Sequence, residues 1–197
     1  DEEESIYKCW YSPFIVAHSA KGMSLSQRKK TTYEGHESQE MAICYATSKD
    51  GLLWKKPSLK LVEFEKSLDN NLIVRGPHGA GIFKDSQAGK TSHRYKSIYQ
   101  GLNISFSQDG FAWSESRFIS RNKIAGDTHN NVLWAPTLGR YVGFTRTWGK
   151  TDRKLVGPET KTNHAWGRQV ARIESADFCD WSKSEVVIDC KKWEHQP

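Results

Sequence analysis

The chain has 197 residues, 37% of them hydrophobic and 26% charged, which excludes a disordered polypeptide and predicts a globular protein. Its formal charge of +6 comes from 29 Lys and Arg residues against 23 Asp and Glu residues, and the basic residues are scattered in small groups, so we expect no nucleic-acid partner. No segment approaches the roughly 20 apolar residues that a membrane helix needs, so we expect no membrane partner.

Strands are the elements that the sequence predicts along its whole length. Aromatic residues make up 12% of the chain and favour pleated surfaces, whereas helical periodicity is absent over any useful length. In chain order, the expected strands are Ile6 to Phe14, Tyr45 to Ser48, Leu59 to Phe64, Asn71 to Lys84, Arg94 to Leu102, Ile104 to Ser107, Ser116 to Ser120, Asn130 to Pro136, Arg140 to Trp148, Ala171 to Ser175 and Glu185 to Asp189. The polar stretches Ala20 to Ser38 and Gly149 to His164 are expected as exposed loops.

One sequence pattern occurs three times along the chain. It consists of a strand, then Ser-x-Asp, a turn residue and a Trp, and its Asp residues are Asp50, Asp109 and Asp177, which lie 59 and then 68 residues apart. Periods of this size indicate a repeated structural unit. Because Ser and Asp at a strand end accept backbone N–H bonds and close a turn, we interpret these Asp residues as turn formers and not as catalytic acids.

The strands around the pattern also recur, which gives four antiparallel strands in each repeat. The repeats span about residues 5–66, 69–122 and 127–192, and the first lacks its innermost strand. Four strands are the composition of a propeller blade, so we predict an all-β fold, with residues 1–197 as a single β-propeller domain or a fragment of one. Closed propellers have roughly four to eight blades, so three units need further blades of a longer chain, or a second chain, to close the ring.

The cysteines bear on metal binding and on location. None of Cys9, Cys44, Cys179 and Cys190 lies in a C-x-x-C pair, so we expect no metal, and we expect no cofactor. Cys9 with Cys44, and Cys179 with Cys190, can pair in an oxidising compartment, and free buried cysteines are the alternative. Possible disulfides and the glycosylation sequon at Asn103 together favour a secreted or extracellular protein, with a cytoplasmic protein as the alternative.

Several runs of the sequence resemble a known family. They are Cys44 to Pro57, Leu61 to Phe64 with Asp69 to Asn71, Phe83 to Asp85 with Arg94 to Lys96, and Asp127 to Val142. These runs are similar to proteins described as glycosyl hydrolase family 32 N-terminal-domain-like, and through them to the five-bladed propeller enzymes that include invertases, levansucrases and arabinanases. The resemblance implies a five-bladed propeller whose innermost strands line a central funnel, with carboxylates from different blades around a sugar.

The resemblance also implies where catalytic groups would lie. Glycoside hydrolysis needs one carboxyl group as acid and a second as base or nucleophile. The family's Arg-Asp-Pro motif corresponds to Lys84-Asp85-Ser86, which keeps Asp85 as a candidate catalytic residue and changes both neighbours. Its Glu-Cys-Pro block corresponds to Leu133 to Pro136, which lacks the Glu, and the strand with the family's nucleophile is not part of this chain. Whether the protein is an enzyme is therefore an open question.

Asp127 is the second candidate catalytic residue. It stands in the polar run Gly126 to Asn131, just before an expected innermost strand, where a general base or an acceptor for a sugar hydroxyl fits. A structural role is the alternative for both carboxylates: Asp127 as a cap or turn between two blades, and Asp85 as the start of a polar turn.

Five further residues are candidates for substrate binding because they lie on or near the expected innermost strands. Arg side chains make planar two-pronged contacts, and His and Trp side chains can bind hydroxyl groups and stack on sugar rings. The five are Arg75, His78, His129, Trp134 and Arg146. The alternative for each is a structural group, which for Trp134 means packing between blades.

These observations predict a carbohydrate-active propeller that resembles glycoside hydrolases and binds or hydrolyses glycosidic substrates in a central funnel. The alternative is a non-catalytic propeller that binds glycans or protein partners. The two hypotheses differ in whether two carboxylates face each other across a concave site, about 5–10 Å apart.

Overall fold

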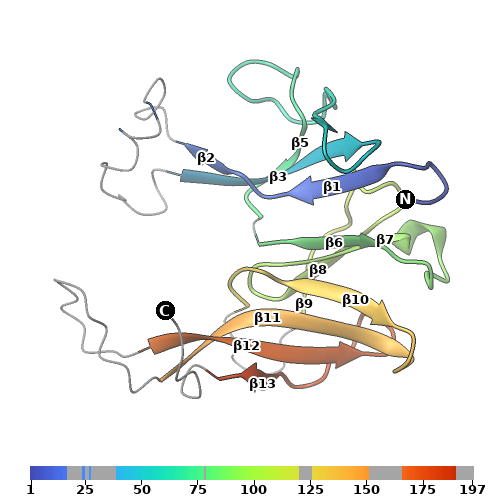
Figure 1. Ribbon diagram of the computed structural model, residues 1–197, viewed down its shortest axis with the longest axis vertical. Coiled ribbons are helices and arrows are strands. Elements are labelled where there is room, and N and C mark those ends of the chain that lie inside the picture. Colours follow the sequence, from blue (N-terminus) through green and yellow to red (C-terminus); the bar gives the residue numbers. More distant parts are fainter. Residues whose placement is uncertain are drawn as a thin grey trace. The chain divides into compact units, whose positions relative to one another are not determined.

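The computed structural model describes residues 1–16, 39–77, 79–119, 126–150 and 166–189, together with Ser24 and Gln27 (Figure 1). The regular secondary structure in these ranges consists of β-strands, apart from a short 3-10 turn at η3 (Thr91–His93), so the expected all-β fold is confirmed. No helix in them has the length and apolar character of a membrane-spanning segment. The chain divides into two compact units, residues 1–78 and 79–197.

The first unit is built around one long strand, β3 (Gln39–Ser48). Four shorter strands pair with it antiparallel, two in succession along each edge. They are β1 (Tyr7–Tyr11) and β2 (Phe14–Val16) on one edge, and β4 (Trp54–Lys55) and β5 (Leu72–Arg75) on the other. A small core of Ala42, Cys44 and Leu72 lies where β3 and β5 pair.

The second unit contains two four-stranded antiparallel sheets in which each strand pairs with the next one in the chain. One sheet consists of β6 (Gly81–Lys84), β7 (Tyr95–Tyr99), β8 (Asn103–Ser107) and β9 (Arg117–Phe118). The other consists of β10 (Asn131–Ala135), β11 (Arg140–Lys150), β12 (Trp166–Ser175) and β13 (Glu185–Ile188). The described residues form three open sheets and no closed ring of blades, so the β-propeller remains a prediction.

Three expected strands differ from the structure. The segment from Ile6 to Phe14 spans β1 and the first residue of β2, with a break at residues 12–13. The segment from Asn71 to Lys84 forms two strands, β5 and β6, because Gly76 between them has a φ of 104°, and β5 joins the sheet of the first unit. The segment from Leu59 to Phe64 is not a strand: its only pairing is a bridge from Phe64 to Ser67. Lys60 and Glu65 have φ values of 57° and 49°, in the left-handed region, which interrupts an extended backbone.

The three Ser-x-Asp turns have the same hydrogen bonds, which confirms their Asp residues as turn formers. In each turn the Ser hydroxyl oxygen accepts the N–H of the Asp and of the residue after it. The Asp Oδ1 accepts the next two N–H groups at 2.8 to 2.9 Å. The residue after the Asp has positive φ in all three, and it is Gly51, Gly110 and, in the third turn, Phe178.

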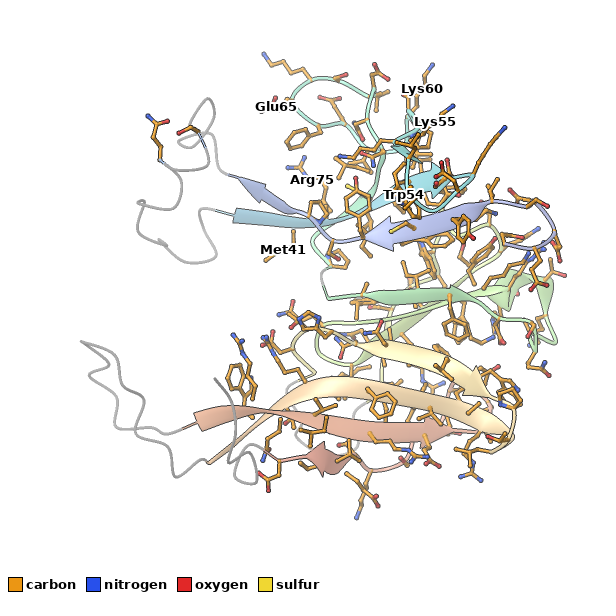
Figure 2. All side chains as sticks on the ribbon, viewed as in Figure 1. Met41, Trp54, Lys55, Lys60, Glu65 and Arg75 are labelled. Carbon is orange, nitrogen blue, oxygen red and sulfur yellow. The ribbon has the colours of Figure 1, made fainter. Side chains whose placement is uncertain are left out.

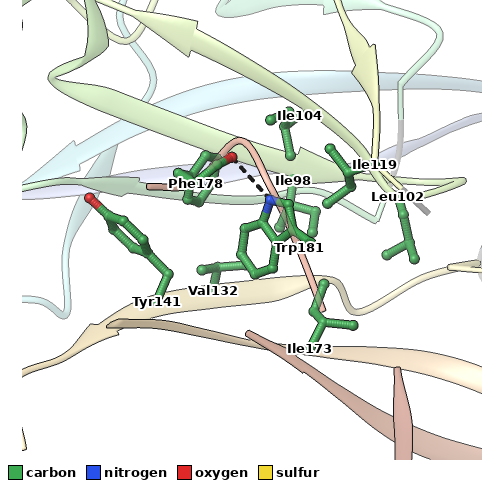
Figure 3. Packing of buried hydrophobic residues seen from close by; sticks show 9 residues of the cluster. All are labelled: Ile98, Leu102, Ile104, Ile119, Val132, Tyr141, Ile173, Phe178 and Trp181. Atoms are coloured by element: carbon green, nitrogen blue, oxygen red, sulfur yellow. Dashed lines mark hydrogen bonds between the residues drawn. The ribbon is translucent and has the colours of Figure 1, made fainter. Parts of the chain in front are cut away.

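Phe178 anchors the core of the second unit. It is completely buried, and its ring packs edge-on against Tyr141 and Trp181 at centroid distances of 5.3 and 5.2 Å. The Trp181 indole donates a hydrogen bond of 3.0 Å to the Phe178 carbonyl oxygen (Figure 3). The other members of the cluster are Ile98, Leu102, Ile104, Ile119, Val132 and Ile173. Since these residues come from both four-stranded sheets, the cluster holds the two sheets together.

Cys9, Cys44 and Cys179 are free thiols in the structure, and Cys190 lies outside the described residues. On the paired strands β1 and β3, Cys9 lies opposite Ala46 and Cys44 opposite Tyr11, so the two cysteines are diagonal neighbours. Diagonal positions in an antiparallel sheet are about 7–8 Å apart, beyond the usual span of a disulfide. The pairing of Cys9 with Cys44 is therefore not formed.

Candidate functional site

The segment 126–130, which leads into β10, is the centre of the candidate site. Asn130 fixes its position, because its completely buried amide donates to the carbonyl oxygens of Gly79 and Gly126, at 3.2 Å each. Its Oδ1 accepts the hydroxyl hydrogen of Thr145 on β11 at 2.5 Å. A buried amide with these partners ties the segment to β11 and to the start of β6.

Two glycines allow this segment to lie directly against the chain at β6. A Cβ at Gly81 would stand 2.3 Å from the carbonyl oxygen of Asn130, and a Cβ at Gly79 would stand 2.8 Å from the Cα of Thr128. Both distances are shorter than real Cβ contacts, and the atoms met belong to the backbone. The close approach therefore requires glycine at both positions.

Asp127 forms an ion pair with Arg146 on β11. The two side chains are 26% and 19% exposed, so the pair reaches the surface without being fully solvated. It presents carboxylate acceptors and guanidinium donors side by side. The Nε of Arg146 and the hydroxyl of Thr128 are buried and have no hydrogen-bond partner within the described ranges.

Trp148 extends the site along β11 and onto β12. Arg146 and Trp148 are two residues apart on β11 and share one face of the sheet, and Arg168 on β12 pairs directly with Trp148. The guanidinium carbons of Arg146 and Arg168 lie 5.1 and 5.7 Å from the centroid of the Trp148 ring, which is a cation–π distance. Asp127, Arg146, Trp148 and Arg168 therefore form a continuous series of contacts, which we call the Arg–Trp row.

His129 belongs to the same segment as Asp127. Its side chain is exposed, and its φ of 57° turns the chain into β10. The structure thus places three of the residues singled out in the sequence, Asp127, His129 and Arg146, on one short segment and the strand to which it is tied.

Asp85, the other candidate carboxylate, lies in the core of the second unit. Its side chain has no exposed surface and forms an ion pair with the buried Lys96 on β7. It also accepts hydrogen bonds from the hydroxyl of Tyr141 on β11, at 2.6 Å, and from the backbone N–H of Gln87, at 2.9 Å. The Lys96 ammonium lies 5.5 to 6.0 Å from the ring centroids of Tyr141, Phe106 and Phe178.

This network shifts the pKa values of Asp85 and Tyr141. Burial acts to raise the pKa of Asp85, but the hydrogen bonds from Lys96, Tyr141 and Gln87 outweigh burial, so the pKa lies below its ordinary value. Burial, and next the hydrogen bond to Asp85, raise the pKa of Tyr141. Asp85 is therefore an ionised structural group that joins the two sheets, and it does not face Asp127 across an exposed site.

The remaining predicted residues do not belong to the Arg–Trp row. Trp134 packs edge-on against Tyr141, with centroids 4.9 Å apart, so packing within the core is the role that its contacts show. Arg75 belongs to the first unit, on β5 (Figure 2), where its guanidinium lies 5.9 Å from the ring of Phe64 and donates to the carbonyl oxygen of Glu63 at 3.4 Å. His78 lies outside the described residues.

Sequence reasoning missed Lys96, Tyr141, Trp148 and Arg168. Strand alternation puts Trp148 on the same face as Arg146, so this neighbour could have been predicted from the sequence. Arg168 becomes its cross-strand partner only once the register of β11 and β12 is known. Within the described ranges, no group of three or more His, Cys, Asp or Glu side chains is arranged to hold a metal ion.

No protein-family model and no curated protein matches this sequence. Among solved structures, the chain is similar to an N-acetylgalactosamine deacetylase from F. plautii, solved in complex with blood group B trisaccharide, with a TM-score of 0.51 and 10% sequence identity. The similarity covers 94% of this chain and 54% of that one, so this chain spans about half the length of the deacetylase. At this identity the likeness concerns the fold alone, although the neighbour is a carbohydrate-processing enzyme.

Proposed function

We propose that this chain is part of a carbohydrate-active β-propeller and that it binds a sugar where the segment 126–130 meets β11. The partly exposed pair of Asp127 and Arg146 carries the proposal. Neighbouring hydroxyl groups of a sugar both donate and accept hydrogen bonds, and a carboxylate beside a guanidinium supplies both partners. The site is held in place by buried Asn130, so little ordering of the protein is needed on binding.

Three observations support a carbohydrate ligand. The fold is all-β and similar to that of a solved carbohydrate-processing enzyme. The sequence resembles propellers that act on glycosides. The exposed His129, on the same segment as Asp127, adds a further group that can bind a hydroxyl.

We favour sugar binding without hydrolysis at this site. A glycosidase needs two carboxyl groups at the scissile bond, one of them an acid with a raised pKa. The side chain of Asp85 is completely buried and its pKa is lowered, so it supplies neither group. Hydrolysis would require a second carboxylate facing Asp127 from elsewhere in a closed ring.

The same proposal includes further sheets that complete the ring. Val132 and Tyr141 of the last sheet face the core cluster, whereas Leu133 and Phe144 lie on its opposite face and are 56% and 41% exposed. A further blade, from a longer chain or a second one, would cover the part of this face around Leu133 and Phe144 and leave open the Arg–Trp row, which lies farther along β11 on the same face. An extracellular location also remains a prediction, because the free thiols of Cys9, Cys44 and Cys179 do not argue for it.

A panel of neutral and acidic oligosaccharides, titrated into the whole chain by calorimetry, tests the proposal. Asp127→Asn should weaken binding of the best neutral ligand about tenfold, because it removes a charge-assisted acceptor for sugar hydroxyl groups. The matched control is Asp180→Asn, which changes an exposed carboxylate outside the Arg–Trp row. Equal affinity of wild type and Asp127→Asn, or no binding of any oligosaccharide, would refute the proposed site, and release of reducing ends by wild type would show hydrolysis after all.

A further inference from the structure

We propose that the Arg–Trp row selects an anionic sugar, whose carboxylate or sulfate group is bound jointly by Arg146 and Arg168. This inference rests on the proposed sugar site and adds the chemical class of its ligand.

The charges of the row are unbalanced. Arg146 and Arg168 supply two positive charges, and Asp127 supplies the single negative charge that is ion-paired within the row. Arg168 is exposed, and within the described ranges its guanidinium group contacts the ring of Trp148 and not a carboxylate. An incoming anionic group would therefore meet one uncompensated positive charge in the row, chiefly that of Arg168.

The geometry holds both guanidinium groups close to one ring. Their carbons lie 5.1 and 5.7 Å from the centroid of the Trp148 indole, so the same ring restrains both side chains. The quadrupole of the indole offsets part of the repulsion between two neighbouring cations. A planar guanidinium binds carboxylate and sulfate oxygens in a two-pronged manner, and restraint by the ring reduces the entropy that binding costs.

The surroundings favour a sugar over other polyanions. The Asp127 carboxylate at one end of the row repels a chain of closely spaced phosphates, but it accepts hydrogen bonds from hydroxyl groups. The indole of Trp148 is 39% exposed, which leaves apolar surface beside the charges for the C–H face of a sugar ring. An oligosaccharide with isolated acidic groups and free hydroxyls fits these features together.

The test compares ligands that differ only in charge. Oligogalacturonate and its fully methyl-esterified form share one backbone, and a carrageenan oligosaccharide, whose anionic groups are all sulfates, separates sulfate from carboxylate as the anionic group. A single-stranded oligonucleotide serves as a polyanion whose negative charges lie on phosphate groups and not on acidic sugars. By calorimetry on the whole chain at fixed salt, we expect at least one acidic oligosaccharide to bind roughly tenfold or more tightly than the neutral ester, the effect of one charge-assisted two-pronged contact.

Arg168→Gln should remove that preference, so that acidic and neutral ligands bind within about threefold of each other. Arg168→Lys, which keeps the charge and loses the planar fork, should retain part of the preference. The matched control is Arg117→Gln, which removes an exposed positive charge on β9, and it should leave the preference unchanged. Thermal unfolding of each variant checks the fold, and because Arg168 is exposed, we expect no loss of stability.

The outcomes separate this inference from the proposed function. Equal binding of neutral and acidic oligosaccharides, with no effect of Arg168→Gln, would overturn the anionic selectivity and leave the sugar site standing. Binding of no oligosaccharide would overturn both. Tightest binding of the oligonucleotide would overturn the choice of a sugar, and loss of preference in Arg117→Gln as well would show that net charge, and not the Arg–Trp row, selects the ligand.

Discussion

Removing the carboxylate of Asp85 tests the network that joins the two sheets of the second unit. In Asp85→Ala, the ammonium of Lys96 stays buried without its counter-ion, and the hydroxyl of Tyr141 loses its acceptor. Breaking a buried ion pair from one side costs about 3–5 kcal/mol, because the remaining charge is left uncompensated. We therefore expect the free energy of unfolding to fall by about this amount.

The loss of stability in Asp85→Ala should depend on the presence of Lys96. In Lys96→Met, the Asp85 carboxylate keeps two hydrogen bonds, from Tyr141 and from the Gln87 N–H, but loses its cation. In the double variant no uncompensated charge remains, so the combined loss should be smaller than the sum of the single losses by at least about 1.5 kcal/mol.

Urea unfolding followed by Trp fluorescence measures these free energies on the whole chain. Asp180→Ala is the control, since its ion pair with Arg117 is exposed, has an N–O distance of 3.8 Å, and should contribute less than about 1 kcal/mol. A loss below about 1 kcal/mol in Asp85→Ala, or additive losses in the double variant, would refute the assignment of Asp85 as a buried structural charge.

Two further predictions concern the same unit. Gly81→Ala should destabilise the protein by about 1–3 kcal/mol, because the added Cβ would meet the backbone of Asn130. Gly89→Ala, which has open space around the added carbon, should leave the free energy of unfolding unchanged in the same urea assay. Equal effects of the two substitutions would contradict the close approach of the chain at Gly81. Because the pKa of Asp85 is lowered in the folded state, its stabilisation is complete above about pH 4 and is lost as the pH falls through the folded-state value. The free energy of unfolding of wild type should therefore decline more steeply below pH 4 than that of Asp85→Asn, and parallel declines would show that Asp85 does not cause the pH dependence.

The sequence predicts the turns well because local hydrogen bonds determine their backbone conformation. Ser and Asp at a strand end, with Gly after them, define the turns at Asp50 and Asp109, and the structure has the expected hydrogen bonds there. The third turn keeps these bonds although Phe178 replaces Gly, since burial of its ring in the core offsets the cost of a positive φ.

Features that depend on tertiary contacts could not be predicted from the sequence. Asp85 looks like a polar residue at the start of a surface turn, and only the folded chain brings the buried Lys96 and Tyr141 to it. The row from Asp127 to Arg168 depends on the register of β11 and β12, which strand alternation alone does not determine. The break between β5 and β6 likewise depends on pairing of β5 with β3, which gives these residues to a different sheet from the one expected.

The most direct test of the account follows the indole N–H of Trp148 by two-dimensional ¹H–¹⁵N NMR during titration with the best oligosaccharide. The chain has 8 Trp residues, and Trp148→Phe identifies the resonance by its loss. We expect the Trp148 resonance to shift more than those of the other Trp residues and to saturate at the affinity measured by calorimetry. A ligand that binds while the Trp148 resonance stays in place would contradict the proposed sugar site beside Asp127 and Arg146.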